Sequence, residues 1–180
     1  MKKRILALAM AAILLLACSC QKATLAGYKL YRSTPLGFAM EYPDFWQKSA
    51  DVGEGIAVFV APTEGYSDEY AENLSVQRFV PDVEGEDPLN TYVKGYVSNL
   101  ESSVKNYRLV AEQNTTLAGQ TAYQIVYETQ SDDETDQMRL LQLFAMNDGK
   151  LYVLTYAAEF GSYSYFLTYV EDMISTFRFL

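Results

Sequence analysis

The chain has 180 residues, 49% of them hydrophobic and 14% aromatic, with a formal net charge of −9 at pH 7. It contains no histidine, which excludes Ser-His-Asp and Cys-His catalysis and histidine-ligated zinc or iron. Its acidity excludes a charge-driven attraction to nucleic acid or to anionic lipid head groups.

The first 17 residues predict a bacterial secretion signal. Three basic residues at 2–4 precede an uncharged run at 5–17, which is too short for a membrane-spanning helix because such a helix needs about 20 apolar residues. The run leads into the sequence LLAC at 15–18, which resembles the lipobox of bacterial lipoproteins. That resemblance implies cleavage before Cys18 and a diacylglycerol on its thiol. The alternative is an ordinary secretory signal with two incidental cysteines.

Cleavage at this point divides the chain into a signal peptide at 1–17, a lipidated Cys18 with a short tether up to residue 27, and a single domain at 28–180. The three basic residues leave with the signal peptide, so the formal charge changes from −9 to −12. A lipidated Cys18 leaves Cys20 without a partner in the chain, so we expect neither a disulfide nor a cysteine-based zinc site. The tether reaches at most ~30 Å, which predicts an extracytoplasmic domain held close to the bacterial membrane.

The first half of the domain predicts short strands and one helix. Turns and loops with proline or glycine separate the expected strands, at 28–33, 38–42, 56–61 and 73–80. Asp87 and Pro88 mark the start of a helix at 88–103, because Asp caps a helix and Pro fits its first position. Gly95 either weakens this helix or allows another element to approach closely.

The second half predicts an antiparallel meander followed by a helix. Turns at 118–119 and 147–149 help to connect the expected strands, at 107–115, 120–129, 137–146 and 150–158. The last two strands are apolar on both faces, so both faces of the sheet must be covered. The final helix is expected from Ser162, as its N-cap, to about residue 176. Its apolar stripe consists of Phe166, Val170, Met173 and Phe177.

Three motifs in chain order resemble those of PsbP-like domains. They are FAMEYPDFW at 38–46, TLAGQTAY at 116–123 and GKLYVLTYAA at 149–158. The resemblance implies an α+β fold, namely an α/β/α sandwich around a central antiparallel sheet. It also implies a non-enzymatic role, since the best-known members dock on membrane complexes as extrinsic subunits or assembly factors. No metal site carries over, because the chain lacks every histidine that such members could use.

The candidate site residues belong to two kinds of surface. Four acidic residues crowd one loop and are weak calcium candidates, with a solvated loop as the alternative: Asp132, Asp133, Glu134 and Asp136. Tyr165 and Tyr169 lie four residues apart and off the apolar stripe of the final helix, so we expect them on a partner contact surface. Trp46 follows a strand end and is either a lid on the core or a ring that contacts a ligand or partner.

Two functions from different classes remain open. The first is a membrane-anchored envelope lipoprotein that acts as a non-enzymatic docking or assembly module for a membrane complex. The second is an envelope hydrolase that uses carboxylates or a lysine. We expect the first, with no cofactor and no nucleic acid, because the sequence contains no catalytic constellation. A deep pocket with converging acids would favour the hydrolase, and a shallow tyrosine-rich groove would favour the docking module.

Overall fold

The computed structural model describes residues 24–49, 55–65, 70–130 and 137–180. The signal peptide, Cys18 and the acidic loop with Asp132, Asp133, Glu134 and Asp136 lie outside these ranges, so what the sequence predicts for them stays a prediction. Within the ranges, no helix is both long enough and apolar enough to cross a membrane.

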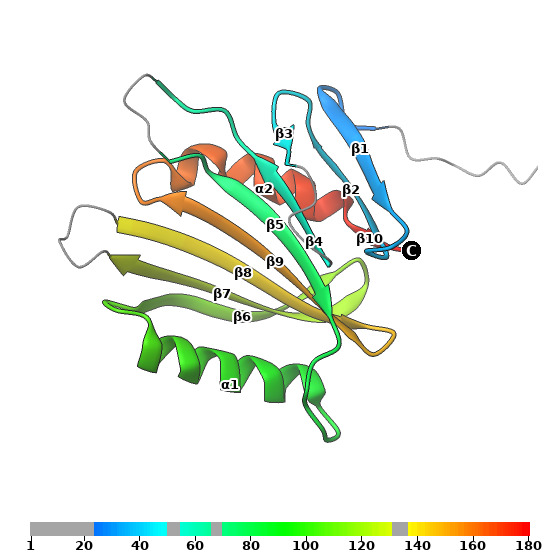
Figure 1. The fold of residues 1–180 in the computed structure, drawn as a ribbon, viewed down its shortest axis with the longest axis vertical. Helices are drawn as coiled ribbons and strands as arrows, with labels where there is room; N and C mark the ends of the chain where they lie inside the picture. The colour runs from blue at the N-terminus through cyan, green and yellow to red at the C-terminus, as the bar shows by residue number, and fades with distance from the viewer. Residues whose placement is uncertain (1–23, 50–54, 66–69, 131–136) are drawn as a thin grey trace, which may run out of the picture.

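Two helices and two antiparallel sheets build the described part of the chain (Figure 1). The helices are α1 (Pro88–Ser103) and α2 (Tyr163–Thr176). The strands are β1 (Tyr28–Ser33), β2 (Phe38–Pro43), β3 (Gln47–Lys48), β4 (Ile56–Val60), β5 (Asn73–Phe79), β6 (Arg108–Leu117), β7 (Gln120–Gln130), β8 (Gln137–Asn147), β9 (Lys150–Glu159) and β10 (Arg178–Phe179). The predicted α+β class is confirmed.

Seven of the described strands form the larger sheet, in the order β3-β4-β5-β9-β8-β7-β6, and all neighbours are antiparallel. Its two tight hairpins turn where the sequence predicts. In β6–β7 the turn residues Ala118 and Gly119 have φ values of 47° and 83°, and in β8–β9 Asp148 and Gly149 have 48° and 70°. Two successive positive φ values give a turn whose twist matches that of the flanking strands.

Helix α1 begins and ends at the predicted residues. The backbone N–H of Asn90 donates to Asp87 Oδ1 (3.1 Å), and Pro88 occupies the first helical position. Gly95 is exposed, and a Cβ added there would meet nothing within 4 Å. Within the part of the chain that the structure describes, no other element approaches this glycine closely, so its effect is to weaken the helix.

The smaller sheet, β1-β2-β10, is only partly predicted by the sequence. Its β1–β2 hairpin is expected, but β10 also joins β2, where Arg178 pairs with Ala39 and Phe179 with Phe38. Two-residue strands such as β3 and β10 carry no periodicity and therefore give no signal. Because of β10, the last described residues lie beside the first hairpin (Figure 1).

The two faces of the larger sheet are covered differently (Figure 1). On the α1 face, Leu89, Val93 and Leu100 of α1 pack against β7, β8 and β9. On the α2 face, the predicted stripe of α2 is buried: Phe166, Val170, Met173 and Phe177. Phe38 and Met40 of β2 belong to the same core as this stripe. The predicted sandwich is confirmed, with one addition: the smaller sheet joins α2 in covering the second face.

Candidate functional site

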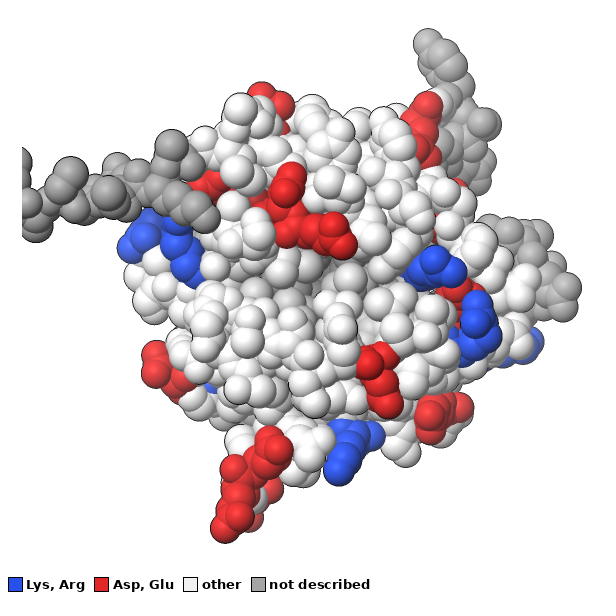
Figure 2. All heavy atoms as spheres, turned by 180° about the vertical axis from the view of Figure 1, so that it is seen from behind, with Lys and Arg blue, Asp and Glu red and all other residues white. Residues whose placement is uncertain are grey.

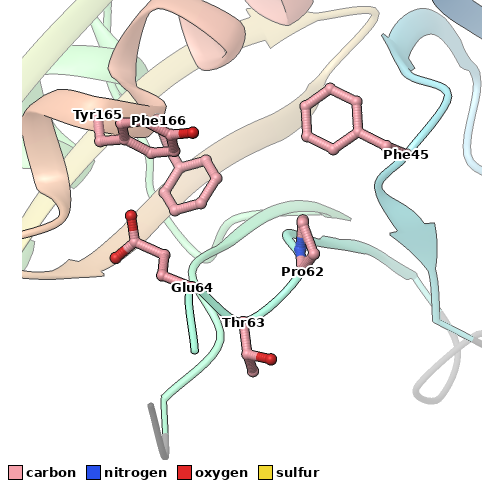
Figure 3. Close-up of a pocket in the computed structure, with 6 residues that line it drawn as sticks. All are labelled: Phe45, Pro62, Thr63, Glu64, Tyr165 and Phe166. Carbon is pink, nitrogen blue, oxygen red and sulfur yellow. The ribbon is translucent and has the colours of Figure 1, made fainter. Parts of the chain in front are cut away.

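A surface groove of about 290 Å³ opens at the N-terminal end of α2. Three segments that lie far apart in the sequence line it, namely the segment after β2, the segment after β4 and the first turn of α2. The lining residues are Phe45, Pro62, Thr63, Glu64, Tyr165 and Phe166 (Figure 3). We call this feature the aromatic groove.

The segment after β2 turns Phe45 outward and Trp46 inward. Pro43 ends β2 because it has no N–H for the ladder, and the N–H of Trp46 donates to the carbonyl oxygen of Pro43 (3.0 Å), which closes a turn. As a result Phe45 is 46% exposed, whereas Trp46 is 2% exposed. The Trp46 ring packs edge-on against Phe166 with 5.9 Å between centroids. Trp46 therefore supports the groove from within the core instead of lining it.

The structure places one predicted contact tyrosine, Tyr165, in the first turn of α2 and the other, Tyr169, one turn further along the helix. Tyr165 is 64% exposed and lines the groove. Tyr169 is partly buried, and its ring meets the ring of Phe45 edge-on with 5.2 Å between centroids. Figure 3 shows the rings of Phe45 and Phe166 on opposite sides of the open space. Sequence reasoning missed Phe45, whose outward direction follows only from the turn at Pro43.

Glu64 is the only carboxylate among the described residues that line the aromatic groove. It accepts a hydrogen bond from Ser162 Oγ. Ser162 is the N-cap residue of α2, as predicted, but its own side chain does not cap the helix. Glu64 therefore places a negative charge near a helix end that attracts one.

A second carboxylate, Glu72, lies near this end of the domain and is 1% exposed. Burial raises the pKa of Tyr156, and the negative charges of Glu72 and Glu64 raise it further. Burial and the charges of Glu72 and Glu159 likewise raise the pKa of Tyr70, although a hydrogen bond with Asn73 opposes them. The carboxylates of Glu64, Glu72 and Glu159 therefore lie close enough to Tyr156 or Tyr70 to act on their pKa values.

The described chain begins beside the aromatic groove. The N–H of Asp44, the neighbour of Phe45, donates to the carbonyl oxygen of Gly27 (2.8 Å). The N–H of Leu25 donates to the carboxylate of Glu41 (2.8 Å), which is 3% exposed. These bonds hold the start of β1 against the end of β2. The segment that precedes residue 24 therefore joins the domain at its groove end.

The other charged groups of the described residues offer no comparable site. Glu128, which is 2% exposed, pairs with Arg108 and Arg139. Acidic residues near the start of α1, such as Glu84, are exposed. On the face opposite to that of Figure 1, acidic side chains stand in small separate groups on a largely uncharged surface (Figure 2). Within the described ranges, no group of three or more His, Cys, Asp or Glu residues is placed to hold a metal ion.

A second cavity of about 240 Å³ lies at the start of α1. Its lining residues are Asp87, Leu89, Asn90, Asn114, Thr121 and Tyr123. Asp87 serves there as the helix cap, and Tyr123 donates a hydrogen bond from its hydroxyl to Glu112 (2.6 Å). Both polar groups therefore have structural roles, and the aromatic groove remains the better candidate.

Comparison with solved structures shows where this fold occurs. Cyanobacterial PsbP (CyanoP) from Synechocystis is 19% identical, with a TM-score of 0.61 over 90% of this chain and 98% of that one. LpqN from Mycobacterium tuberculosis, described as involved in cell envelope biogenesis, is 11% identical, with a TM-score of 0.58 over 83% of this chain and 88% of LpqN. The Ran-binding protein Mog1p from Saccharomyces cerevisiae is 10% identical, with a TM-score of 0.57 over 84% of this chain and 95% of Mog1p.

At these identities the structural likeness establishes the fold alone. No curated protein matches the sequence significantly. A family model described as PsbP-like protein, however, matches residues 19–179, which is most of the chain. The motifs at 38–46, 116–123 and 149–158 all fall within this match. The chain therefore belongs to the PsbP-like family.

Proposed function

We propose that this protein is a lipid-anchored module on the extracytoplasmic side of the bacterial membrane, which docks through the aromatic groove on an envelope protein and does not catalyse a reaction. In this proposal residues 1–17 are a signal peptide, Cys18 carries the lipid, and 28–180 is the docking domain. The observation that carries the proposal is the pair of exposed rings, Phe45 and Tyr165, at the end of the domain where the tether joins.

The position of the groove suits a partner at the membrane. The tether of ~30 Å confines the domain near the bilayer, which raises its effective concentration toward any membrane-bound partner. Aromatic side chains are favoured at docking surfaces, because they offer a large contact area at a low cost in conformational entropy. Phe45 and Tyr165 together supply such an area beside the tether.

Proteins of the same fold support a binding role. Mog1p is described as Ran-binding, and LpqN as involved in cell envelope biogenesis. The PsbP-like family match supports the same reading, since the best-known members of that family dock on membrane complexes. None of these proteins identifies the partner of this chain.

The arrangement of acids favours docking over the hydrolase alternative. A carboxylate-dependent hydrolase of the glycosidase type needs two acids that flank the bond to be broken. Among the described residues that line the groove, Glu64 is the only acid and none is a lysine. Glu72 is 1% exposed, so its carboxylate is not presented at the surface.

Photo-cross-linking in cells tests the proposal. A photoreactive amino acid replaces Ser164, which is exposed on α2 beside Tyr165, in a chain with Cys18 intact. We expect one discrete cross-linked envelope protein, and we expect the double variant Tyr165→Ala, Phe45→Ala to lose at least about tenfold of the product, because a truncated hot-spot residue costs about 2 kcal/mol.

A matched control removes an exposed apolar side chain elsewhere. Val110 of β6 is 41% exposed, and Val110→Ala should leave the cross-link unchanged. The variant Cys18→Ser should release the protein from membranes and remove its lipid mass. Unchanged membrane association without lipid would contradict the anchor, and the absence of any cross-linked product from the parent chain would contradict docking.

A further inference from the structure

We infer that the aromatic groove recognises a cationic side chain, arginine or lysine, on its protein partner. This inference rests on the proposed docking function and names the chemistry of the contact. Its three components are the aromatic rings of the groove, the carboxylate at its edge and the electronegative potential of the surrounding elements.

Aromatic rings form two sides of the aromatic groove. Phe45, which is 46% exposed, stands on one side of the open space, and Tyr165, which is 64% exposed, belongs to the other side, where it packs edge-on against the buried Phe166 with 4.8 Å between centroids (Figure 3). Aromatic faces attract cations, by about 0.5–1 kcal/mol at exposed sites and about 2 kcal/mol when water is excluded. A guanidinium is planar and can stack on such a ring while its N–H groups reach a carboxylate.

The same kind of contact already occurs within the molecule, at the start of α2. The guanidinium carbon of Arg139 lies 4.6 Å from the ring centroid of Phe160 and 5.3 Å from that of Tyr163. Arg139 is also paired with the buried Glu128. An aromatic pair with an adjacent carboxylate thus holds an arginine within this fold, and the groove presents the same combination to a partner.

Glu64 supplies the negative charge that attracts a cationic side chain. Its carboxylate points toward Tyr165 and Phe166 in Figure 3 and is held by Ser162 Oγ. A carboxylate can accept several hydrogen bonds at once, so a partner's arginine can add to the contacts that Glu64 already makes. No lysine or arginine is among the lining residues.

The charges on neighbouring elements also favour a cation. Glu72 and Glu159 contribute negative potential at this end of the domain. Among the cations on adjacent elements, Lys29 donates to the carbonyl oxygen of Asp44 (2.8 Å), Arg139 is paired with Glu128, and the Lys48 ammonium lies 5.1 Å from the ring centroid of Tyr31.

An anionic ligand is disfavoured although the groove adjoins a helix N-terminus. Such an end attracts anions, but here Glu64 already supplies one by bonding to the N-cap residue Ser162. A second anion would be repelled by it. The open shape also favours a side chain over a free small molecule, because small-molecule sites enclose most of the ligand surface.

The direct test is an NMR titration of the mature chain carrying Cys18→Ser. The probes are the peptide acetyl-Gly-Arg-Gly-amide and its citrulline counterpart, which has nearly the same shape and no charge. We expect saturable shifts at Phe45, Tyr165 and Glu64 with the arginine peptide, and binding at least about fivefold weaker with citrulline. Equal binding of the two peptides, shifts elsewhere, or no shifts would overturn the inference.

Glu64→Gln keeps the shape and an acceptor for Ser162, and should reduce the preference for arginine to about twofold or less. Glu171→Gln, on the exposed side of α2, is the matched control and should keep the full preference. The cross-link at residue 164 separates the two proposals. A cross-linked partner that survives Glu64→Gln undiminished overturns cation recognition and leaves docking intact, whereas no partner with the parent chain overturns docking itself.

Discussion

The α1 face and the α2 face of the larger sheet are packed in different ways. On the α2 face the contacts are dense and aromatic: Phe38 stacks on Phe177 with 5.2 Å between centroids and 12° between planes, and both rings are buried. On the α1 face a polar group lies in the interface. Gln142 is 5% exposed, and its Nε2 donates to the hydroxyls of Tyr96 (2.9 Å) and Thr155 (3.1 Å).

This difference in packing predicts that the α1 layer and the α2 layer differ in local stability. The α2 face joins α2, the smaller sheet and the larger sheet in one core, and the aromatic groove lies at its end. The α1 face holds a single helix on a smaller core, in which the Oε1 atom of Gln142 has no hydrogen-bond partner. Local opening follows the least buried contacts, so we expect α1 to open before α2.

The largest expected effect comes from a matched pair of leucines. Leu154 of β9 is fully buried on the α2 face, and Leu100 of α1 is 8% exposed on the α1 face. Leu154→Ala should lower the free energy of unfolding by about 4 kcal/mol and Leu100→Ala by about 2 kcal/mol, because the cost rises with the cavity left behind. Urea denaturation measures both. Equal costs would break the proposed contrast between the faces.

Glu128 is a charged exception on the α2 face. Burial alone would raise its pKa, but hydrogen bonds and charges from Arg139 and Arg108 outweigh burial and lower it. Glu128→Gln should reduce the free energy of unfolding by about 3 kcal/mol at pH 7, because it leaves two arginines facing a neutral group.

The dependence of stability on pH in the acid range tests whether the charge of Glu128 is responsible for this contribution. Because the pKa of Glu128 in the folded state lies below the ordinary value of 4.5, its contribution is complete above that value and is lost as the pH falls through the lowered one. The difference between the parent chain and Glu128→Gln should therefore shrink below about pH 4.5. A difference that stays constant to pH 2 would contradict a contribution from the charge of Glu128.

Replacing glycine by alanine should raise the free energy of unfolding at one position and lower it at another. At Gly95 of α1 a methyl group meets open space, so Gly95→Ala should raise the free energy of unfolding by about 0.5–1 kcal/mol. At Gly37 φ is +70° and a Cβ would lie 2.7 Å from the hydroxyl oxygen of Tyr152, so Gly37→Ala should lower it by at least about 1 kcal/mol. Thermal unfolding of the two variants and of the parent chain measures both changes in stability. A destabilised Gly95→Ala would mean that α1 is packed more tightly than described.

The smallest expected effect is the coupling inside the α1 face. In a double-mutant cycle with Gln142→Met and Tyr96→Phe, each single change should cost about 1 kcal/mol, and the double change should cost less than their sum by about 0.5–1 kcal/mol. The reason is that, once one member of the Gln142–Tyr96 pair is removed, removing the other loses no further hydrogen bond between them. Strict additivity in the cycle would mean that the 2.9 Å bond contributes nothing.

Much of this fold can be predicted from the sequence where the signals are local. Asp87 and Pro88 fix the start of α1, and the turns at 118–119 and 147–149 fix two hairpins, because a few adjacent residues decide each of them. The pairing of β10 with β2 could not be predicted, since it joins residues 38–39 to residues 178–179 through two residue pairs. Contacts across such a separation depend on the completed core.

Part of the candidate site can likewise be predicted from the sequence, and part cannot. Helical periodicity places Tyr165 off the core stripe, and the structure finds it 64% exposed. Phe45 and Trp46 are adjacent aromatic residues, and nothing in the pair indicates which ring faces outward. The segment at 62–64 approaches α2 across about one hundred residues of chain, so Glu64 has no signal in the sequence. The lipid on Cys18 stays a prediction.

Trp46 has a practical consequence, because it is the only tryptophan in the chain and lies on the α2 face beneath the groove, against Phe166. Its intrinsic fluorescence therefore reports on one layer of the protein. A peptide that enters the groove should change the emission without any added label. Detachment of α1 should leave the emission unaltered while the helical signal in far-ultraviolet circular dichroism falls. Unfolding curves recorded by the two methods would then separate, and their separation would measure how independently the α1 layer moves.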